Sequence, residues 1–370
     1  MKKTLLFSAI LSLAVSAQAA EPTLLKVFEY ELNGEPASSD ARFGTGYNGS
    51  VLTQSRANKQ IIAWNATGKS VYAENNAFNG TAITRDEVGN LLVGSGFSAV
   101  TSSTNWSIVD SEKNVIPVTF SGFTAARLDQ VGRVVGNMLS ETGAYVYLTP
   151  NTFGNVIAVK IYKSGEEVKA EGVESKALGV SCNTSYVAQP SVESIGEANA
   201  NTFYWRNRSD QKICYFNDNS VANFTTPSEA NGSTIRSCEG FDVFTLDGIT
   251  YAIQPFDKVN YGAGFVICKT DGTIVATRTS DFVPGGQRFQ SLVAEKIDEK
   301  TANIYQYVSG GIAAMFVFTT DDNVITGVEE TLIDANAPVE YYNLQGVKVA
   351  NPEKGLFIKK QGNKATKVVL

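Results

Sequence analysis

The sequence predicts an all-β protein, a β-propeller of six four-stranded blades followed by a small C-terminal β module. Three observations lead to this prediction. The composition favours strands, with 32 Gly, 15 Tyr and 20 Phe among 370 residues and only 18% charged residues. One hairpin pattern recurs about every 50 residues. A second hairpin precedes most copies of the first, so that one period holds four strands.

The recurring hairpin consists of a short apolar or aromatic run, a polar Gly/Asn/Asp turn and a second β-rich run. Six turn positions mark it, namely Gly68, Asn114, Gly165, Ser220, Gly272 and Asn323. Their successive spacings are 46, 51, 55, 52 and 51 residues. These turns use residues that tolerate the positive φ of tight hairpins. We therefore expect six blades, the last of them ending in a strand over 324–326, with seven as the next count.

The preceding hairpins run from 81–86 into 91–94, from 124–129 into 133–136, from 241–247 into 249–253 and from 291–298 into 303–307. Four-stranded sheets stack face to face around an axis because a single sheet cannot bury both of its faces. Residues 24–30 are expected to form an extra strand that closes the ring on the last blade. Two β-sandwiches or a β-solenoid are the competing architectures. A solenoid has shorter and stricter repeats, and two sandwiches require no uniform period.

The first 19 residues have the organisation of a secretory signal peptide. Lys2 and Lys3 form a positive n-region, residues 5–15 form a short apolar run, and Ala17-Gln18-Ala19 supplies the cleavage pattern. The apolar run is too short for a membrane anchor, which needs about 20 apolar residues. We expect cleavage after Ala19 and export to the periplasm, the cell surface or the extracellular space.

The charge balance argues against two classes of partner. Without Lys2 and Lys3, 29 basic residues face 37 acidic ones, and the formal charge falls from −6 to −8. Nucleic acids and anionic membranes both need clustered Lys and Arg, so neither is an expected partner. No later segment is apolar enough to be a transmembrane helix.

The sequence contains no histidine. This excludes Ser-His-Asp and Cys-His catalysis and every His-ligated metal site. The four cysteines lack the close CxxC spacing of a zinc site, and they are Cys182, Cys214, Cys238 and Cys268. In an oxidising compartment they allow two disulfides in three connectivities, whereas Cys214 and Cys268, inside apolar runs, equally suit buried thiols. We predict no metal and no cofactor.

Aspartates recur at the repeat turns, at Asp86, Asp129, Asp247, Asp271 and Asp298. A glycoside hydrolase needs paired carboxylates, but Asp in a turn caps its own backbone, and recurrence at equivalent turns indicates a structural role. The segment 269–273 matches the sialidase Asp box only weakly, because no tryptophan follows. Calcium-loop, P-loop and Rossmann patterns do not occur in suitable contexts. No catalytic residue is therefore assigned.

Aromatic residues near predicted loops are the candidate ligand contacts. The segment 139–155 is predicted to be the longest inter-strand loop, and it carries Tyr145, Tyr147 and Phe153. Trp106 and Tyr261 fall in corresponding connections of other blades. Exposed rings suit stacking on sugars or peptides. The alternative is that these rings pack between blades, and Trp106 in particular fits a strand.

After Thr326 the chain changes character. Residues 327–338 are polar, acidic and small, as in a linker, so the propeller domain is expected over 20–326 and three short strands over 339–370. The order Tyr342-Asn-Leu-Gln-Gly346, then Gly355-Leu-Phe-Ile358, then 364–369 resembles the C-terminal sorting domain associated with type IX secretion in Bacteroidota. The resemblance covers about the last 30 residues and implies export with surface display. A small module that docks on the propeller is the alternative.

These observations favour an exported, non-catalytic binding or scaffold protein that presents a propeller face to a glycan or to another surface protein. A carbohydrate-active enzyme, either a glycoside hydrolase or a lyase, is the second hypothesis. It requires two carboxylates that converge at the channel mouth, roughly 5–10 Å apart. A structural component of a surface assembly is the third hypothesis.

Overall fold

The structure is a computed structural model of the chain. It describes residues 21–37, 39–94, 106–121, 131–148, 155–177, 202–206, 213–217, 220–223, 229–230, 233–235, 240–257, 264–279, 290–321, 339–343, 348–349, 352, 356–361 and 364–369. Within these ranges every regular element is a β-strand. The chain divides into two compact units, Met1–Asp321 and Asp322–Leu370, and each is described by itself.

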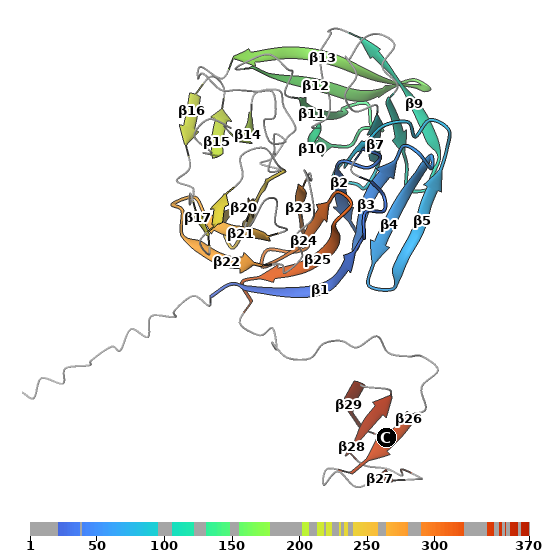
Figure 1. Cartoon of the computed structure of the whole chain (residues 1–370), viewed down its shortest axis with the longest axis vertical. Coiled ribbons are helices and arrows are strands. Elements are labelled where there is room, and N and C mark those ends of the chain that lie inside the picture. Colours follow the sequence, from blue (N-terminus) through green and yellow to red (C-terminus); the bar gives the residue numbers. More distant parts are fainter. Residues whose placement is uncertain are drawn as a thin grey trace, which may run out of the picture. The chain divides into compact units, whose positions relative to one another are not determined.

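The first unit is a β-propeller whose blades follow one another along the chain (Figure 1). Blade 1 is an antiparallel sheet of β2 (Gly44–Tyr47), β3 (Ser50–Ser55), β4 (Gln60–Asn65) and β5 (Gly68–Glu74). Blade 2 contains β6 (Ala82–Arg85), β7 (Leu91–Gly94), β8 (Trp106–Val109) and β9 (Val115–Ser121). Blade 3 contains β10 (Val131–Gly136), β11 (Ala144–Leu148), β12 (Asn155–Ser164) and β13 (Glu167–Ala177). The outer strands β9 and β13 pair in parallel, which joins blades 2 and 3 into one eight-stranded sheet.

The remaining three blades repeat this plan. Blade 4 is described through β14 (Thr202–Arg206), β15 (Ile213–Asn217) and β16 (Ser220–Asn223). Blade 5 contains β19 (Asp242–Leu246), β20 (Ile249–Asp257), β21 (Gly264–Lys269) and β22 (Ile274–Arg278). The short strands β17 (Glu229–Ala230) and β18 (Ser233–Ile235) extend this sheet at the far end of β20. Blade 6 contains β23 (Gln290–Lys296), β24 (Thr301–Val308) and β25 (Ile312–Thr319).

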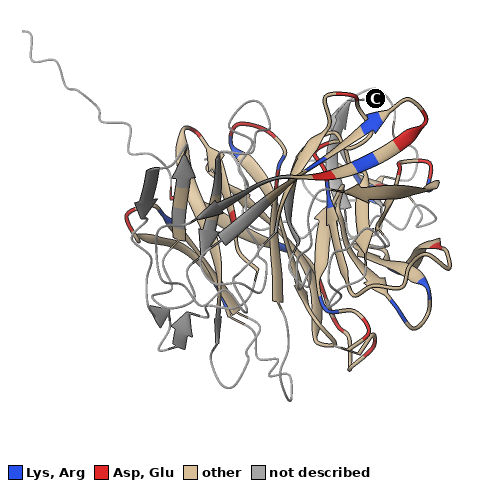
Figure 2. Cartoon of the chain, turned by 90° about the horizontal axis from the view of Figure 1, so that it is seen from above, with Lys and Arg blue, Asp and Glu red and all other residues tan. Residues whose placement is uncertain are grey.

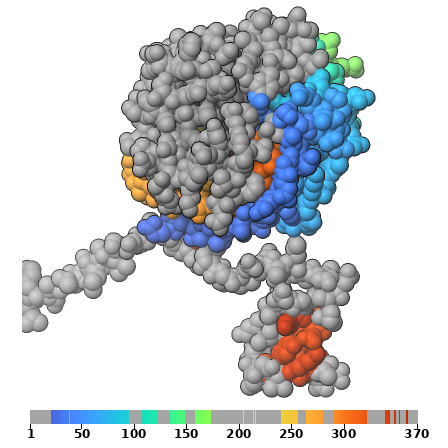
Figure 3. All heavy atoms as spheres, viewed as in Figure 1, coloured from blue at the N-terminus to red at the C-terminus, as the bar shows by residue number. Residues whose placement is uncertain are grey.

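The fourth strand of blade 6 comes from the other end of the chain. Strand β1 (Thr23–Glu31) pairs antiparallel with β25 along its whole length, from Thr23 opposite Thr319 to Glu31 opposite Ile312. Figure 1 shows the blue β1 beside the orange β25, and in Figure 3 the blue atoms of this strand lie on the outside of the ring. The expected closure by residues 24–30 is confirmed.

The same pairing bears on the expected last strand over 324–326. β1 occupies the free edge of β25, where that strand was predicted to pair. Residues 324–326 themselves lie outside the described ranges. The sixth blade is therefore completed by the N-terminal strand, and the blade count stays at six.

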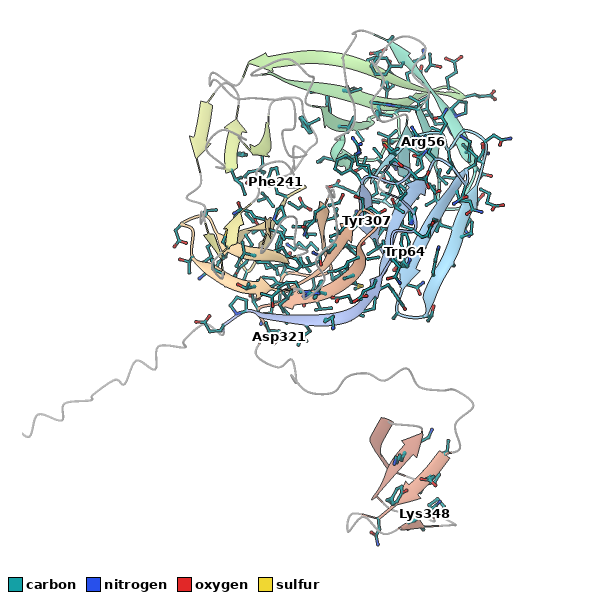
Figure 4. The ribbon with its side chains drawn as sticks, in the orientation of Figure 1. Arg56, Trp64, Phe241, Tyr307, Asp321 and Lys348 are labelled. Carbon is teal, nitrogen blue, oxygen red and sulfur yellow. The ribbon has the colours of Figure 1, made fainter. Side chains whose placement is uncertain are left out.

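The core of the propeller lies between neighbouring blades. Each sheet is apolar on both faces, so each blade covers the next. Between blades 2 and 3, Trp106 meets Phe120 edge-on at 5.4 Å inside a cluster that continues into β10–β13. Tyr251 of blade 5 contacts Phe318 of blade 6 at 5.2 Å between ring centroids. The ring centroids of Trp64 in blade 1 and Tyr307 in blade 6 lie 6.0 Å apart. Figure 4 labels both residues.

The second unit is a small antiparallel sheet. Its strands are β26 (Val339–Tyr342), β27 (Lys348–Val349), β28 (Leu356–Gln361) and β29 (Lys364–Val369), in the order β27-β26-β28-β29. The sequence analysis expected three strands here, and the structure has four. Glu340 joins two of its neighbours, because it accepts hydrogen bonds from the Lys348 ammonium and from the Tyr342 hydroxyl at 2.7 Å. The predicted linker 327–338 lies outside the described ranges.

Candidate functional site: the inner-turn face

One end of the propeller is formed by the turns that join the two inner strands of each blade. We call this end the inner-turn face. The described inner turns are 47–50 in blade 1, 86–90 in blade 2, 137–143 in blade 3, 247–248 in blade 5 and 297–300 in blade 6. The inner strands β2, β6, β10, β19 and β23 lie in contact with those of neighbouring blades, so these turns encircle the axis.

Hydrogen bonds connect the inner turns of blades 5, 6 and 1. The backbone N–H of Asp247 donates to the carbonyl of Glu299 at 2.8 Å. The backbone N–H of Asn48 donates to Oε1 of Glu295 at 3.2 Å. Next to it, the N–H of Gly49 donates to the hydroxyl oxygen of Tyr305 at 2.9 Å. Side chains of blade 6 therefore hold the inner turn of blade 1 in place.

Tyr305 and Glu295 of blade 6 are joined by a hydrogen bond at this face. The Tyr305 hydroxyl donates to Oε2 of Glu295, and Asn303 Nδ2 donates to the same oxygen at 3.3 Å. Burial of the ring, and then the bond to Glu295, raise the pKa of Tyr305 well above its ordinary value. The ring is only 1% exposed. The pair fastens blade 1 to blade 6 through the bonds to Asn48 and Gly49.

Blade 1 is connected to blade 2 through Tyr47 and Arg85. The Tyr47 hydroxyl donates to the carbonyl of Val88 at 3.2 Å. Nε of Arg85 donates to the carbonyl of Gly46 at 2.6 Å, and its guanidinium carbon lies 5.2 Å from the centre of the Tyr47 ring. The Arg85 charge is thus placed over an aromatic face beside a backbone carbonyl, which compensates for its burial.

Blade 2 is connected to blade 3 through Asp86. Its Oδ1 accepts the N–H groups of Val88 at 3.1 Å and of Asn90 at 2.9 Å. Its Oδ2 accepts Nδ2 of Asn90 at 2.8 Å and the N–H of Met138, in the turn of blade 3, at 3.0 Å. Burial raises the pKa of Asp86 although these four hydrogen bonds oppose the shift. One carboxylate therefore caps its own turn and joins two blades.

A continuous belt of hydrogen bonds follows from these contacts. It runs from blade 5 through blades 6, 1 and 2 to blade 3, and each step joins one inner turn to the next blade. The chain thus fixes five turns of one face relative to one another. Such a face is preorganised, because little conformational entropy remains to be lost when a partner binds.

The recurrent aspartates have the structural role that the sequence analysis expected of them. Asp86 caps its turn as described above. Asp271 accepts the N–H of Thr273 at 2.9 Å, and Asp298 accepts that of Lys300 at 2.8 Å. Asp247 has a φ of 50° and forms a tight turn with Gly248 at 72°. Asp129 lies outside the described residues.

The predicted aromatic loop 139–155 is corrected by the structure. Residues Ala144–Leu148 form strand β11, which pairs with β10 and β12. Tyr147 is fully buried and Tyr145 partly buried on this strand. Burial raises the pKa of Tyr147 far above its ordinary value. The Val- and Tyr-rich run Ala144–Leu148 was the sequence signal that could have identified the strand.

Of the other predicted ligand residues, the structure describes Trp106. Trp106 opens β8 and is 3% exposed in the core between blades 2 and 3. Neither Trp106 nor Tyr147 is accessible to a ligand in this structure. Phe153 and Tyr261 lie outside the described residues. Ligand contact by Tyr145, Phe153 and Tyr261 stays a prediction.

Cys268 is a buried thiol and not part of a disulfide. Its Sγ accepts a hydrogen bond from Nε2 of Gln254 at 3.2 Å and donates to the carbonyl of Ala252 at 3.7 Å. Among the described residues, no three His, Cys, Asp or Glu side chains gather as metal ligands would. Nor does the described part of the chain include a helix with the length and apolar character to cross a membrane.

Comparison with known proteins gives no family. No family model matches the chain, and no curated protein matches it. The chain is similar to a solved DUF4623 family protein from Bacteroides eggerthii, at 11% identity and a TM-score of 0.49 over 81% of this chain and 76% of that chain. It is similar to a putative gluconolactonase at 11% identity and a TM-score of 0.45, over 80% of this chain and 98% of that chain. It is also similar to a calcium-binding regucalcin from Agrobacterium tumefaciens, at 11% identity and a TM-score of 0.40 over 74% of this chain and 92% of that chain.

Proposed function

We propose that this chain is an exported, non-catalytic binding or scaffold protein that holds a glycan or a protein on the inner-turn face of its propeller. The belt of hydrogen bonds from blade 5 to blade 3 is the observation that carries the proposal. It fixes the inner turns, whose side chains then form a rigid platform around the axis. Loops and turns on such a scaffold are the usual place for recognition.

Asp86 and Glu295, the two carboxylates that join blades at this face, support binding more than catalysis. Asp86 accepts four hydrogen bonds, and Glu295 accepts from Asn48, Asn303 and Tyr305. A glycosidic acid or base needs an oxygen that faces the substrate. These two groups already serve the contacts between blades.

A glycan array tests the binding function, together with product analysis on the same sugars and a displayed random-peptide library. The probe protein is residues 20–370. We expect retention of at least one sugar or peptide class without any product. Turnover of a sugar would contradict the proposal, and so would the absence of any retained sugar or peptide.

Export is proposed from the N-terminal signal, and surface display from the C-terminal resemblance. N-terminal sequencing of the protein made in a Gram-negative host is expected to start at Ala20. In a Bacteroidota host, surface labelling is expected to depend on residues 339–370. An N-terminus at Met1 contradicts export through this signal. Unchanged labelling after deletion of 339–370 contradicts a sorting role for the module.

A further inference from the structure

We infer that the partner of the inner-turn face is a protein segment that carries aliphatic side chains next to Lys or Arg. This inference rests on the proposed binding function and narrows its partner from two classes to one. It is carried by two properties of the described inner turns, the apolar side chains that they expose and the sign of their charge.

The exposed apolar side chains at this face are aliphatic. Val88 is 52% exposed, Ile249 37% and Ile297 53%. These residues belong to the inner turns of blades 2, 5 and 6 or directly follow them. Seven large apolar side chains are this exposed among the described residues, and three of them therefore lie at one face of the propeller. Exposed apolar side chains on the turns of one face offer area that a partner can bury.

Backbone contacts fix the turn at each of the three residues. The N–H of Val88 is bound to Asp86 at 3.1 Å. The N–H of Ile297 is bound to the carbonyl of Thr301 at 2.9 Å. Ile249 directly follows the tight turn at Asp247 and Gly248, and the N–H of Asp247 joins that turn to the turn that carries Ile297. These hydrogen bonds fix the backbone of the turns on which the three side chains are exposed.

A protein fits this surface better than a glycan does. Sugars are recognised by flat aromatic rings, and Tyr47 is the aromatic residue of the described inner turns. Its hydroxyl is bound to Val88, and a β-carbon on Gly89 would lie 2.4 Å from its ring, so Gly89 covers that ring. Aliphatic side chains instead bury apolar area against other aliphatic groups, at about 25 cal/mol per Å².

The charge of the face selects the partner further. Glu87, Glu141, Asp247, Asp298 and Glu299 are exposed in the described inner turns, against Lys296 and Lys300. The Lys296 ammonium lies 2.9 Å from Glu299, so part of the positive charge is already compensated. Figure 2 shows acidic residues in several of the turns that join the strands. The negative charge of these turns attracts Lys and Arg of a partner toward the exposed aliphatic side chains and repels acidic partners.

A matched pair of variants tests the inference. Val88→Ser with Ile297→Ser removes two of the exposed aliphatic side chains of the inner-turn face. Val27→Ser with Val71→Ser removes side chains of similar exposure, 45% and 50%, on the outer strands β1 and β5. A displayed random-peptide library is selected on residues 20–370, and enriched peptides are then measured by calorimetry against the parent and both variants. Thermal melting establishes that each variant is folded, and Ile297→Ser alone replaces the inner pair if that pair does not fold.

We expect enriched peptides with aliphatic and basic residues. The Kd of these peptides should rise at least tenfold for the inner pair, the Val88→Ser and Ile297→Ser variant. It should rise less than twofold for the outer pair, the Val27→Ser and Val71→Ser variant. Glu141→Gln with Glu299→Gln should weaken binding about threefold, and 500 mM NaCl should weaken it further. Peptides that bind the inner pair as well as the parent would overturn the inference and leave the binding function intact. So would glycan binding without peptide binding. A protein that binds neither class contradicts both proposals.

Discussion

Gly46 of blade 1 lies flat against the ring of Tyr305 in blade 6. A β-carbon built on Gly46 would come within 1.9 Å of Cγ of Tyr305, far closer than van der Waals contact. Gly46→Ala is therefore expected to lower the free energy of unfolding by about 3 kcal/mol, because the added methyl forces the two blades apart. Urea unfolding of residues 20–370, followed by fluorescence, measures the loss.

A double-mutant cycle identifies the cause of that loss. In a Tyr305→Gly background the three atoms nearest to the added methyl, Cγ, Cδ2 and Cβ of Tyr305, are absent, and Gly46→Ala should cost less than about 1 kcal/mol. If Gly46→Ala costs as much without the Tyr305 ring as with it, then the two residues are not in contact.

The turns that begin at Asp86 and Asp110 have the same hydrogen bonds, but within the described part of the chain only Asp86 also bonds to another blade. Substitutions at the two residues therefore distinguish the contribution of local capping from that of the contact between blades. Asp86 and Asp110 both accept the N–H of the fourth residue after them and the side chain of an Asn at that position. Asp86 is fully buried and also holds Met138, whereas Asp110 is half-exposed. Asp86→Ala should cost roughly 2–3 kcal/mol of unfolding free energy and Asp110→Ala about 1 kcal/mol or less. Equal losses would show that Asp86 contributes nothing between blades.

The same two residues predict opposite dependences on pH. Burial raises the pKa of Asp86, so the folded state binds its proton more tightly, and its contribution to stability falls as pH rises past about 3.8. Hydrogen bonds from Asn114 and neighbouring N–H groups lower the pKa of Asp110, so its contribution is present above 3.8 and lost as pH falls further. Asn variants serve as references that do not titrate.

The unfolding free energy of the parent minus that of each Asn variant gives these contributions between pH 2.5 and 7. The difference for Asp86→Asn should fall with rising pH, and the difference for Asp110→Asn should rise. Two curves of the same sign would contradict the placement of Asp86 in the interior.

The blade plan could be predicted because it depends on local turn chemistry. Gly68, Gly165 and Gly272 all have positive φ in the structure, as expected for hairpin turns. The pairs β4–β5, β8–β9 and β21–β22 fall where the period placed them. Closure by the N-terminal strand was also expected, but the competing strand over 324–326 fits the same pattern. Only the pairing of β25 decides between them.

Blade 3 shows why a local sequence pattern does not always predict the position of a turn. The segment Asp129-Gln-Val-Gly132-Arg133 resembles the turn Asp86-Glu-Val-Gly89-Asn90, but Gly132 lies within β10. Asn90 closes its turn by bonding Asp86 through its side-chain amide, and Arg133 has no such amide. The turn of this hairpin lies instead at 137–143, where Gly143 has a φ of 79°.

The inner-turn face was beyond prediction for a different reason. Glu295 and Asn48 are 247 residues apart in the chain, and Tyr305 and Gly49 are 256 apart. Nothing local in either segment marks these partners. A repeat predicts which residues occupy turns, but it does not predict which turns bond across blades or which side chains stay exposed.

β1 closes the ring by completing blade 6 next to blade 1, and a disulfide tests this closure directly. Leu25 and Val317 are direct partners in the β1–β25 register. Cα atoms of such pairs lie about 4.5–5.5 Å apart, within disulfide range. In residues 20–370, Leu25→Cys with Val317→Cys should form a disulfide, detected by peptide mapping, and raise the melting temperature. Ile325→Cys with Val317→Cys should not. A disulfide between 317 and 325, with none between 25 and 317, would contradict the closed ring described here.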